Sequence, residues 1–211
     1  MIKILAIGDS HIPRRAKSIP IQICDVLEKS VMNGKFDYTL FTGDVVNAPR
    51  FMEYLKRITK TETLVVIGNM DYYGGNQNAP LYQRIEIPLE TKEKFTIGLI
   101  HGHQINPRGD HAQLGSLAIH NNYNILISGH THKEEVFLTR DGVLLVNPGS
   151  VTGAWSFVAS RNPSFIVLKI NDITSKINIT LHQYDIKASK FREINFNYIF
   201  KNDKIHSRIE G

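Results

Sequence analysis

The sequence of 211 residues predicts an α/β fold in which two facing β-sheets are flanked by helices. Two observations lead to this prediction: apolar strand-like runs alternate with helical patterns up to residue 133, and only strand-like runs follow it. In addition, each early strand ends where a short motif rich in Asp, His or Asn begins. The length suits one domain, which we expect over residues 1–200, followed by a polar, frayed tail over 201–211.

Two successive βαβ units are predicted for the first 67 residues. Apolar residues recur at helical spacing through Ile23, Leu27 and Val31, and Pro49 opens a second helical pattern through Leu55. Compact apolar runs at residues 2–7, 38–42 and 64–67 indicate the three strands. Because βαβ connections join parallel strands, we expect the carboxyl ends of these strands to meet at one edge of a sheet.

The remainder of the chain predicts further strands. They are expected at residues 85–87, 95–100 and 125–128, with a helix at 114–119. Beyond residue 133 we expect antiparallel pairing, because runs at 136–138 and 143–146 flank an Asp141-Gly142 turn, and runs at 165–170 and 177–184 follow. Residues 194–200 alternate apolar with polar and predict a strand that either completes a sheet or offers an edge for interaction. The polar loop 72–83 is either a gate or a plain connector.

The composition restricts the class of protein. Hydrophobic residues make up 42% and charged residues 21% of the chain, which excludes a disordered one. Cys24 is the only cysteine, so no intrachain disulfide can form, and we expect a cytoplasmic protein. Neither a signal peptide nor a membrane-spanning apolar run is present, so direct membrane insertion is not expected. The net charge of +5 is scattered without a nucleic-acid-binding motif, which argues against a nucleic-acid partner. Arg14, Arg15 and Lys17 are placed to meet a phosphate or an acidic partner.

Five short motifs of Asp, His and Asn fall in one order along the chain. Taken alone, Asp9 suits a helix cap or a turn, a Gly-Asp pair suits a turn, and Asn69 suits a left-handed corner. His130 and His132 give the strongest local signal, because they flank one residue in a loop after a buried strand and so converge on one region. The ordered set predicts a two-metal site. Its motifs are Asp9-Ser10-His11, Gly43-Asp44, Gly68-Asn69-Met70-Asp71, His101-Gly102-His103 and Gly129-His130-Thr131-His132.

The ligand types indicate a class of metal and a class of reaction. Neutral imidazoles, carboxylates and one amide, without a thiolate, suit two divalent ions such as Mn²⁺, Zn²⁺ or Fe²⁺. Two such ions about 3.5–4 Å apart clamp a phosphoryl oxygen, lower the pKa of a bridging water and stabilise an in-line displacement. Hydrolysis of a phosphoester is therefore the reaction that the motifs favour.

The motifs resemble those of the calcineurin-like metallophosphoesterase superfamily, and every metal-ligand position of that family is filled. A narrower similarity to its branch of small retromer subunits extends over residues 1–200 and includes residues 8–15, 98–104, 127–133 and 147–154. The resemblance implies the two-sheet metallophosphoesterase fold and two divalent metal ions. It assigns Asp9, His11, Asp44 and His132 to one ion, and Asp44, Asn69, His101 and His130 to the other.

The similarity to retromer subunits implies a scaffold role. In that role the metal-bearing face docks against a helical-solenoid subunit of a complex for endosomal protein sorting, so the chain reaches endosomal membranes only through its partners. This role predicts an exposed apolar patch around the metal face, to which we expect Ile12, Pro13 and Met70 to contribute. We favour this function because the longer matches lie outside the ligand set.

The alternative is an active phosphodiesterase that hydrolyses phosphoester bonds at a dinuclear metal centre. Asp44 and Asn69 match the pattern of the enzymes, whereas animal retromer subunits depart from it at these two positions. Met70 stands where active phosphoesterases often have His or Cys, and a thioether cannot donate a proton to a leaving group. His103 is the candidate substitute. The predicted catalytic residues are then Asp44, Asn69 and His103, with weak activity expected.

Overall fold

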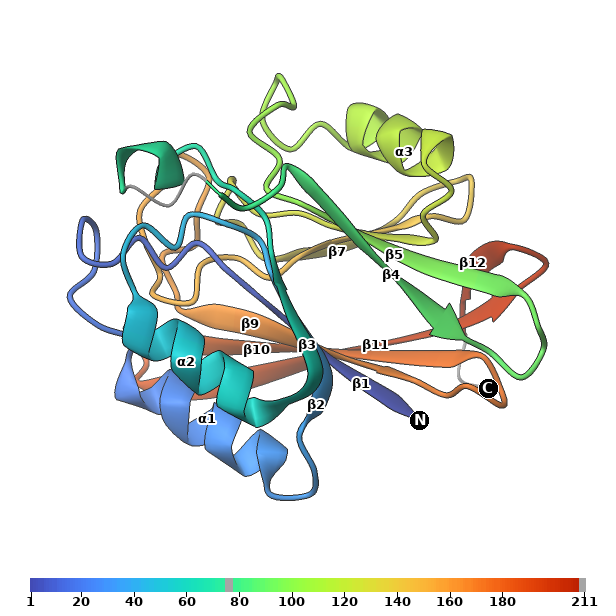
Figure 1. Ribbon diagram of the computed structural model, residues 1–211, viewed down its shortest axis with the longest axis horizontal. Coiled ribbons are helices and arrows are strands. Elements are labelled where there is room, and N and C mark those ends of the chain that lie inside the picture. The colour runs from blue at the N-terminus through green and yellow to red at the C-terminus, as the bar shows by residue number, and fades with distance from the viewer. Residues whose placement is uncertain (75–77, 209–211) are drawn as a thin grey trace.

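The computed structural model describes residues 1–74 and 78–208 and confirms the predicted α/β fold of two sheets. The larger sheet has seven strands and the smaller one five. Figure 1 shows the sheets facing each other, with helices on their outer sides. None of the helices in the described part of the chain is long and apolar enough to cross a membrane.

The two predicted βαβ units form one half of the larger sheet. β1 (Ile2–Ile7), β2 (Phe36–Phe41) and β3 (Thr59–Val65) are parallel, and α1 (Ile21–Val31) and α2 (Pro49–Ile58) connect them. β3 starts directly where α2 ends, earlier than the predicted start at residue 64. The strands of the other half are antiparallel. The order of the whole larger sheet is β12-β11-β10-β9-β1-β2-β3. The antiparallel strands are β9 (Ser164–Ile170), β10 (Lys176–Asp185), β11 (Lys190–Lys201) and β12 (Lys204–Ser207).

The smaller sheet confirms the predicted hairpin and adds a parallel pair. β7 (Glu135–Leu138) and β8 (Leu144–Asn147) pair antiparallel, as predicted, and on its other side β8 pairs parallel with β6 (Ile125–Ile127), which the sequence does not predict. The reason is burial, because every residue of β8 is buried and therefore suits an inner position, while the partly exposed β7 takes the edge. With β4 (Tyr82–Pro88) and β5 (Lys94–Ile100), the order is β4-β5-β6-β8-β7.

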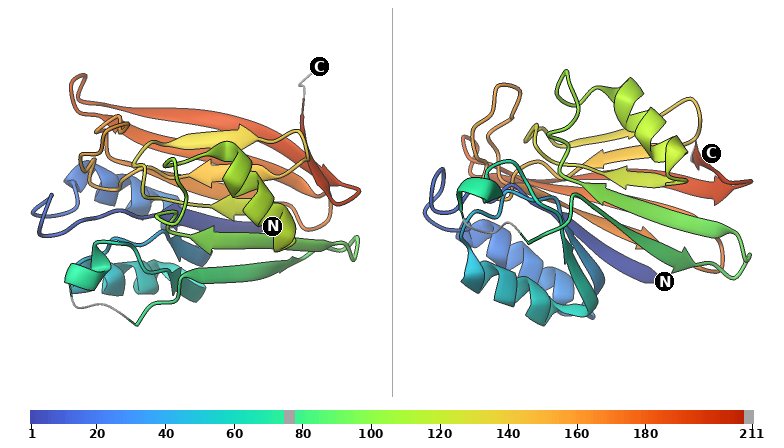
Figure 2. Two further views of the ribbon diagram at one scale, coloured as in Figure 1. Left: turned by 90° about the horizontal axis from the view of Figure 1, so that it is seen from above. Right: turned by 45° about the horizontal axis from the view of Figure 1, so that its top comes forward.

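Three apolar layers hold the stack together. The central layer lies between the sheets and includes Ile97 and Leu168. α1 and α2 pack on the larger sheet through Leu27 and Leu55, and α3 (His111–His120) packs on the smaller sheet through Leu114. The right-hand view of Figure 2 shows α3 on one outer side and the other two helices on the opposite side. The ends of the sheets are therefore left for the loops that carry the polar motifs.

The chain is folded from residue 201 to residue 207, in contrast to the frayed tail predicted for 201–211, of which residues 209–211 lie outside the described residues. β12 pairs with β11, and Ile205 is 1% exposed in the core between the sheets. One apolar residue in an otherwise polar segment is too weak a pattern to predict a strand. β11 has the predicted apolar face, with Phe196, Tyr198 and Phe200 against the central core, and β12 forms the edge of the sheet.

The predicted polar loop 72–83 is described only in part. A short 3-10 helix, η1 (Asp71–Tyr73), opens it, and β4 begins at Tyr82. Residues 75–77, in the middle of the loop, lie outside the described residues. A gating role for this loop stays a prediction.

Replacing Ile205 by Ala is expected to lower the free energy of unfolding by about 2 to 4 kcal/mol, because it removes buried methyl groups from the central core. Ser207→Ala, at the exposed end of the same strand, is the matched control and should change this free energy by less than about 0.5 kcal/mol. Urea denaturation measures both. Equal stability of Ile205→Ala and the parent chain would show that β12 does not support the core.

Candidate metal centre

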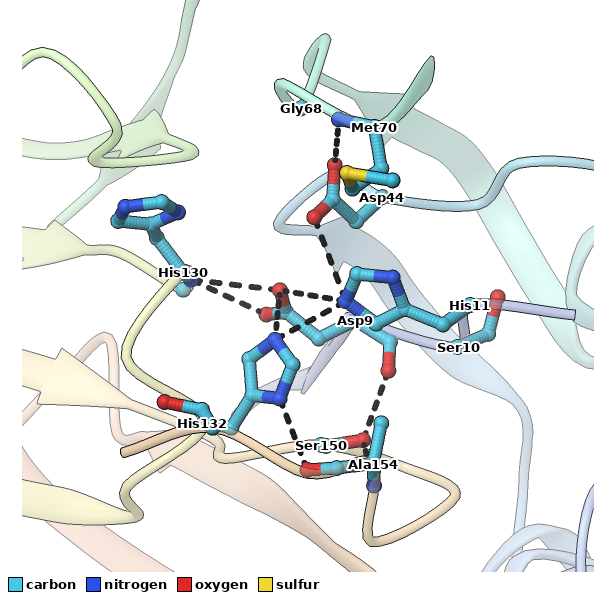
Figure 3. A network of polar contacts seen from close by, with 12 residues as sticks. Asp9, Ser10, His11, Asp44, Gly68, Met70, His130, His132, Ser150 and Ala154 are labelled. Carbon is cyan, nitrogen blue, oxygen red and sulfur yellow. Dashed lines mark hydrogen bonds and ion pairs between the residues drawn. The ribbon is translucent and has the colours of Figure 1, made fainter. Parts of the chain in front are cut away.

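All five polar motifs meet at one end of the two sheets, as the sequence predicts. Figure 3 shows side chains from several loops turned toward one cluster. The loops come from both sheets, so the cluster lies where the two sheets face each other. The motif residues are Asp9 and His11 after β1, Asp44 after β2, Asn69 after β3, His101 after β5, and His130 and His132 after β6.

Four of these residues, Asp9, His11, Asp44 and His132, form a compact buried cluster that we call the first subsite. At most 3% of each residue is exposed, and one ligand atom from each lies within 4.8 Å of the others. His11 Nε2 is 3.3 Å from Asp44 Oδ2, and His132 Nε2 is 3.3 Å from Asp9 Oδ1. Two imidazoles and two carboxylates that converge in this way can hold one divalent ion.

The residues predicted for a second ion are gathered less tightly. His101 Nε2 lies 3.5 Å from Asp44 Oδ2 and 3.2 Å from Asn69 Oδ1. Asp44 Oδ2 therefore faces imidazoles on both sides, as a bridging ligand would. The ring centroid of His130 is 5.0 Å from that of His101, and its ring lies apart from the first subsite in Figure 3. The ring centroid of His103 is 5.4 Å from that of His101, so His103 and His130 border the partly exposed side of the centre.

The backbone is left-handed at most of the ligand positions. A positive φ is uncommon for residues other than glycine and costs about 1–3 kcal/mol each, so such residues collect where function constrains the chain. In this site the left-handed backbone turns neighbouring side chains of one loop toward the same point. The residues are Asp9 (φ 50°), His11 (φ 47°), Asp44 (φ 55°), His130 (φ 67°) and His132 (φ 58°).

Asp71 organises the loops after β2 and β3, a role that the sequence does not indicate. Its carboxylate is 2% exposed and accepts the backbone N–H groups of Asp44 at 2.9 Å, Val46 at 2.7 Å and Gly68 at 2.8 Å. Three such bonds satisfy a buried carboxylate and fix the two loops against each other. The only signal in the sequence is the position of Asp71 at the end of the third motif.

Backbone carbonyl groups orient two of the imidazoles. His101 Nδ1 donates to the carbonyl of Thr42 at 2.7 Å, and His132 Nδ1 donates to that of Ala154 at 2.9 Å. A proton held on Nδ1 leaves Nε2 with its lone pair toward the centre, which is the tautomer that a metal ligand needs.

The loop after β8 also closes on the site. Ser150 Oγ donates to the carbonyl of Asp9 at 2.7 Å and accepts the N–H of Ala154 at 2.9 Å. Thr152 Oγ1 donates to the carbonyl of Ser10 at 3.0 Å. These residues lie in the stretch 147–154 that resembles retromer subunits, but the sequence assigns them no role.

Two glycines leave room for the carboxylates. A Cβ atom at Gly68 would overlap the Asp44 carboxylate, and one at Gly129 would overlap that of Asp9. The glycines of the third and fifth motifs therefore serve close packing against the ligands.

Burial and charge set opposite protonation states within the first subsite. Burial lowers the pKa of His11 to about 3 and raises the pKa of Asp44 to about 6. Burial opposes ionisation of Asp9, but the charge and hydrogen bond of His132, together with the smaller contributions of His101 and His11, outweigh it and hold the pKa of Asp9 well below its ordinary value. Burial likewise opposes protonation of His132, but Asp9 raises that pKa above its ordinary value. The Nε2 atoms of His132 and His11 are 2.9 Å apart, so protonated His132 donates to neutral His11, and a metal ion would replace this proton.

A comparison with protein families matches residues 2–172 to the calcineurin-like phosphoesterase superfamily domain. The chain is also 36% identical over 165 residues to a probable metallophosphoesterase of Methanothermobacter thermautotrophicus. That match covers 78% of this chain and 84% of the archaeal protein.

Two solved structures have a similar fold. Vacuolar protein sorting 29 (Vps29) from Cryptosporidium parvum has a TM-score of 0.79 at 30% identity, over 94% of this chain and 98% of that one. Wild-type Vps29 of Entamoeba histolytica, complexed with Zn²⁺, has a TM-score of 0.76 at 32% identity, over 92% of this chain and 99% of that one. Both matches extend over nearly the whole chain.

Metal affinity is expected to fall at acidic pH, because protons compete for the ligand atoms. Above the pKa values of Asp44 (about 6) and of His132 (raised above its ordinary value) the affinity should be constant, and below them it should fall as these groups take up protons. We expect the apparent dissociation constant for Zn²⁺ to rise at least about tenfold from about pH 7.5 to about pH 5.5. Competition with a chromophoric chelator measures it.

Asp44→Asn is the matched variant for this titration. It should bind Zn²⁺ more weakly at neutral pH and show a shallower decline with acid, because the proton on Asp44 is no longer part of the competition. An affinity of the parent chain that is independent of pH over this range would contradict the assigned ligands.

Proposed function

Because the chain belongs to the calcineurin-like phosphoesterase superfamily, we propose that it is a metal-binding scaffold subunit of a retromer-like complex. In this role it binds divalent metal at the end of the sheets and docks a helical-solenoid partner for endosomal protein sorting. It is then cytoplasmic and reaches endosomal membranes through that partner. The similarity to Vps29 structures over more than nine tenths of the chain supports the proposal.

The observation that carries the proposal is an exposed apolar rim next to the metal ligands, made of Tyr73, Trp155, Phe157 and Val158. Their exposed fractions are 70%, 46%, 83% and 53%. The rings of Trp155 and Phe157 meet edge to face, 4.9 Å apart between centroids. Trp155 directly follows Ala154, whose carbonyl accepts the Nδ1–H of the ligand His132. Exposed aromatic side chains gathered in this way are typical of a protein interface.

Two arginines tie the rim to the first metal motif. Arg15 donates to the carbonyl of Trp155 at 2.9 Å, and Arg14 donates to that of Tyr73 at 2.9 Å. The guanidinium of Arg14 also lies over the Tyr73 ring, 5.7 Å from its centroid. These contacts hold loops from three parts of the chain in one surface and add positive charge to it. A partner with an apolar ridge flanked by carboxylates would match this surface.

The rim differs in part from the patch predicted from the sequence. Pro13 is exposed, but Ile12 and Met70 are only partly exposed. Trp155 and Phe157 supply larger exposed groups, and no periodic pattern in the sequence marks them. Exposed apolar groups thus lie beside the metal face, where the patch was predicted, but most of them come from residues other than the predicted ones.

Replacing both Trp155 and Phe157 by Ser is expected to raise the dissociation constant for the helical-solenoid retromer subunit of the same organism at least about tenfold, because aromatic anchors dominate such interfaces. Isothermal titration calorimetry with the purified proteins measures it. Met32→Ser is the control, since Met32 is 80% exposed at the far end of α1. Failure of the parent chain to bind the solenoid at micromolar concentration would overturn the scaffold role.

A second candidate function is phosphodiester hydrolysis, and the place of Asp44 supports it. Its Oδ2 faces His11 at 3.3 Å and His101 at 3.5 Å, as expected for a ligand shared by two ions. The two ions would supply a bridging water as nucleophile and stabilise the charge that develops on the phosphoryl group. Asn69, His101 and His130 would hold the second ion beside Asp44.

The proton donor for the leaving group limits this activity. Met70 contributes a backbone N–H to Asp44 Oδ1 at 2.7 Å, but its thioether has no proton to donate. Burial and the neighbouring His101 lower the pKa of His103, which leaves it mostly neutral at neutral pH. His103 is therefore a weak acid catalyst here, and good leaving groups should react best.

Slow hydrolysis of bis(p-nitrophenyl) phosphate is expected in the presence of Mn²⁺, measured by release of nitrophenolate. His101→Ala should lower the rate at least about tenfold, because it removes a ligand and the contact with Asp44. His120→Ala, at the exposed end of α3, is the control and should keep the full rate. Absence of turnover by protein shown to contain metal would rule out the enzyme.

A further inference from the structure

A cavity of about 450 Å³ borders the metal centre on the side of α3. Thr131, which stands between the ligands His130 and His132, forms part of its wall. Buried polar residues, Ser128 and Asn147, line it together with apolar side chains. The volume suits a small organic ligand or part of one.

Arg108 lines this cavity as well. It belongs to the loop after β5, which begins with His101. The next residue, Gly109, packs so closely on the wall that a Cβ there would lie 2.9 Å from Thr131 Cγ2. Arg108 thus shares the wall of one cavity with Thr131, the residue between His130 and His132.

The other charged groups of the cavity have partners. Glu135 accepts from Lys133 at 2.9 Å and from His111 at 2.7 Å. Asp110 caps α3 by accepting the N–H of Gln113 at 2.8 Å. Within residues 1–74 and 78–208, Arg108 has neither an ion pair nor a hydrogen bond from its guanidinium. Arg108 is therefore the cation of this cavity that is available to a ligand.

An available arginine beside a site for divalent cations has a specific consequence. Its charge repels the metal ions, and an anion that contacts both relieves the repulsion. The planar guanidinium offers paired N–H donors that match phosphate and carboxylate oxygens. We propose that Arg108 binds a second anionic group of a small phosphate ester whose phosphoryl group lies at the metal centre. The ligand class is then a bisphosphate or a phosphorylated carboxylate, and the inference rests on the proposed phosphoester chemistry.

Calorimetric titration with fructose 1,6-bisphosphate and fructose 6-phosphate tests this inference without a measurement of turnover. Protein saturated with Mn²⁺ should bind the bisphosphate about tenfold more tightly, the gain expected from one charge-assisted contact. Arg108→Gln should reduce the preference to about twofold or less and leave the affinity for the monophosphate nearly unchanged. Arg108→Lys, which keeps the charge without the planar fork, should give an intermediate preference.

Arg84→Gln is the matched control, because Arg84 lines a different cavity on β4 and lies 3.6 Å from Glu86. It should keep the full preference for the bisphosphate. Equal affinities of the parent chain for the two sugars, or an unchanged preference in Arg108→Gln, would overturn the role of Arg108. The affinity for fructose 6-phosphate is also measured with and without Mn²⁺. An affinity that does not depend on Mn²⁺ would overturn the phosphoester function itself, whatever the role of Arg108.

Discussion

The Asp44 carboxylate is the contact on which the rest of the site depends, because it lies where the two sheets meet. Its Oδ2 faces His11 from the larger sheet at 3.3 Å and His101 from the smaller sheet at 3.5 Å. Its Oδ1 accepts the N–H of Met70 at 2.7 Å, and its own N–H is held by Asp71. One carboxylate thus joins loops from β1, β2, β3 and β5. Since these strands also form the central core, the packing of apolar side chains between the sheets sets the spacing of the ligands.

Burial of these charges links metal binding to folding. Asp9 and Asp44 are at most 1% exposed, and an ionised carboxylate that is buried without a partner costs several kcal/mol. A proton on His132 balances the charge of Asp9, whereas burial raises the pKa of Asp44. A divalent cation balances both carboxylates at once. The left-handed backbone at the ligands adds further strain, which the bonds of Asp71 and Ser150 help to offset. Metal binding is therefore expected to stabilise the fold as well as the site.

The meeting of the predicted ligands at one place could be predicted from the sequence, because each follows an apolar run that marks the end of a strand. The residues that hold the predicted ligands in place could not be predicted. Asp71 and Ser150 act on backbone groups, which leave no trace in the pattern of side chains. Ile205 is a single apolar residue in a polar segment, and Trp155 lies in a loop without periodicity, so neither gives a signal. The parallel pairing of β8 depends on how completely it is buried, which follows from the assembled sheet.

The apolar rim and the metal centre are not independent surfaces. A metal ion on His132 Nε2 would fix the ring whose Nδ1 donates to Ala154, and Trp155 follows at the next position. Arg15 holds the carbonyl of Trp155 from the first ligand loop. A complete ligand set is therefore useful to a scaffold, because it orders the surface that a partner contacts. Val158 of the rim and Thr131, which stands between His130 and His132, line one cavity, so a solenoid seated on the rim would also cover the side from which a phosphoester would enter. Docking and hydrolysis would then compete for one face, so an active enzyme is expected only in the free chain.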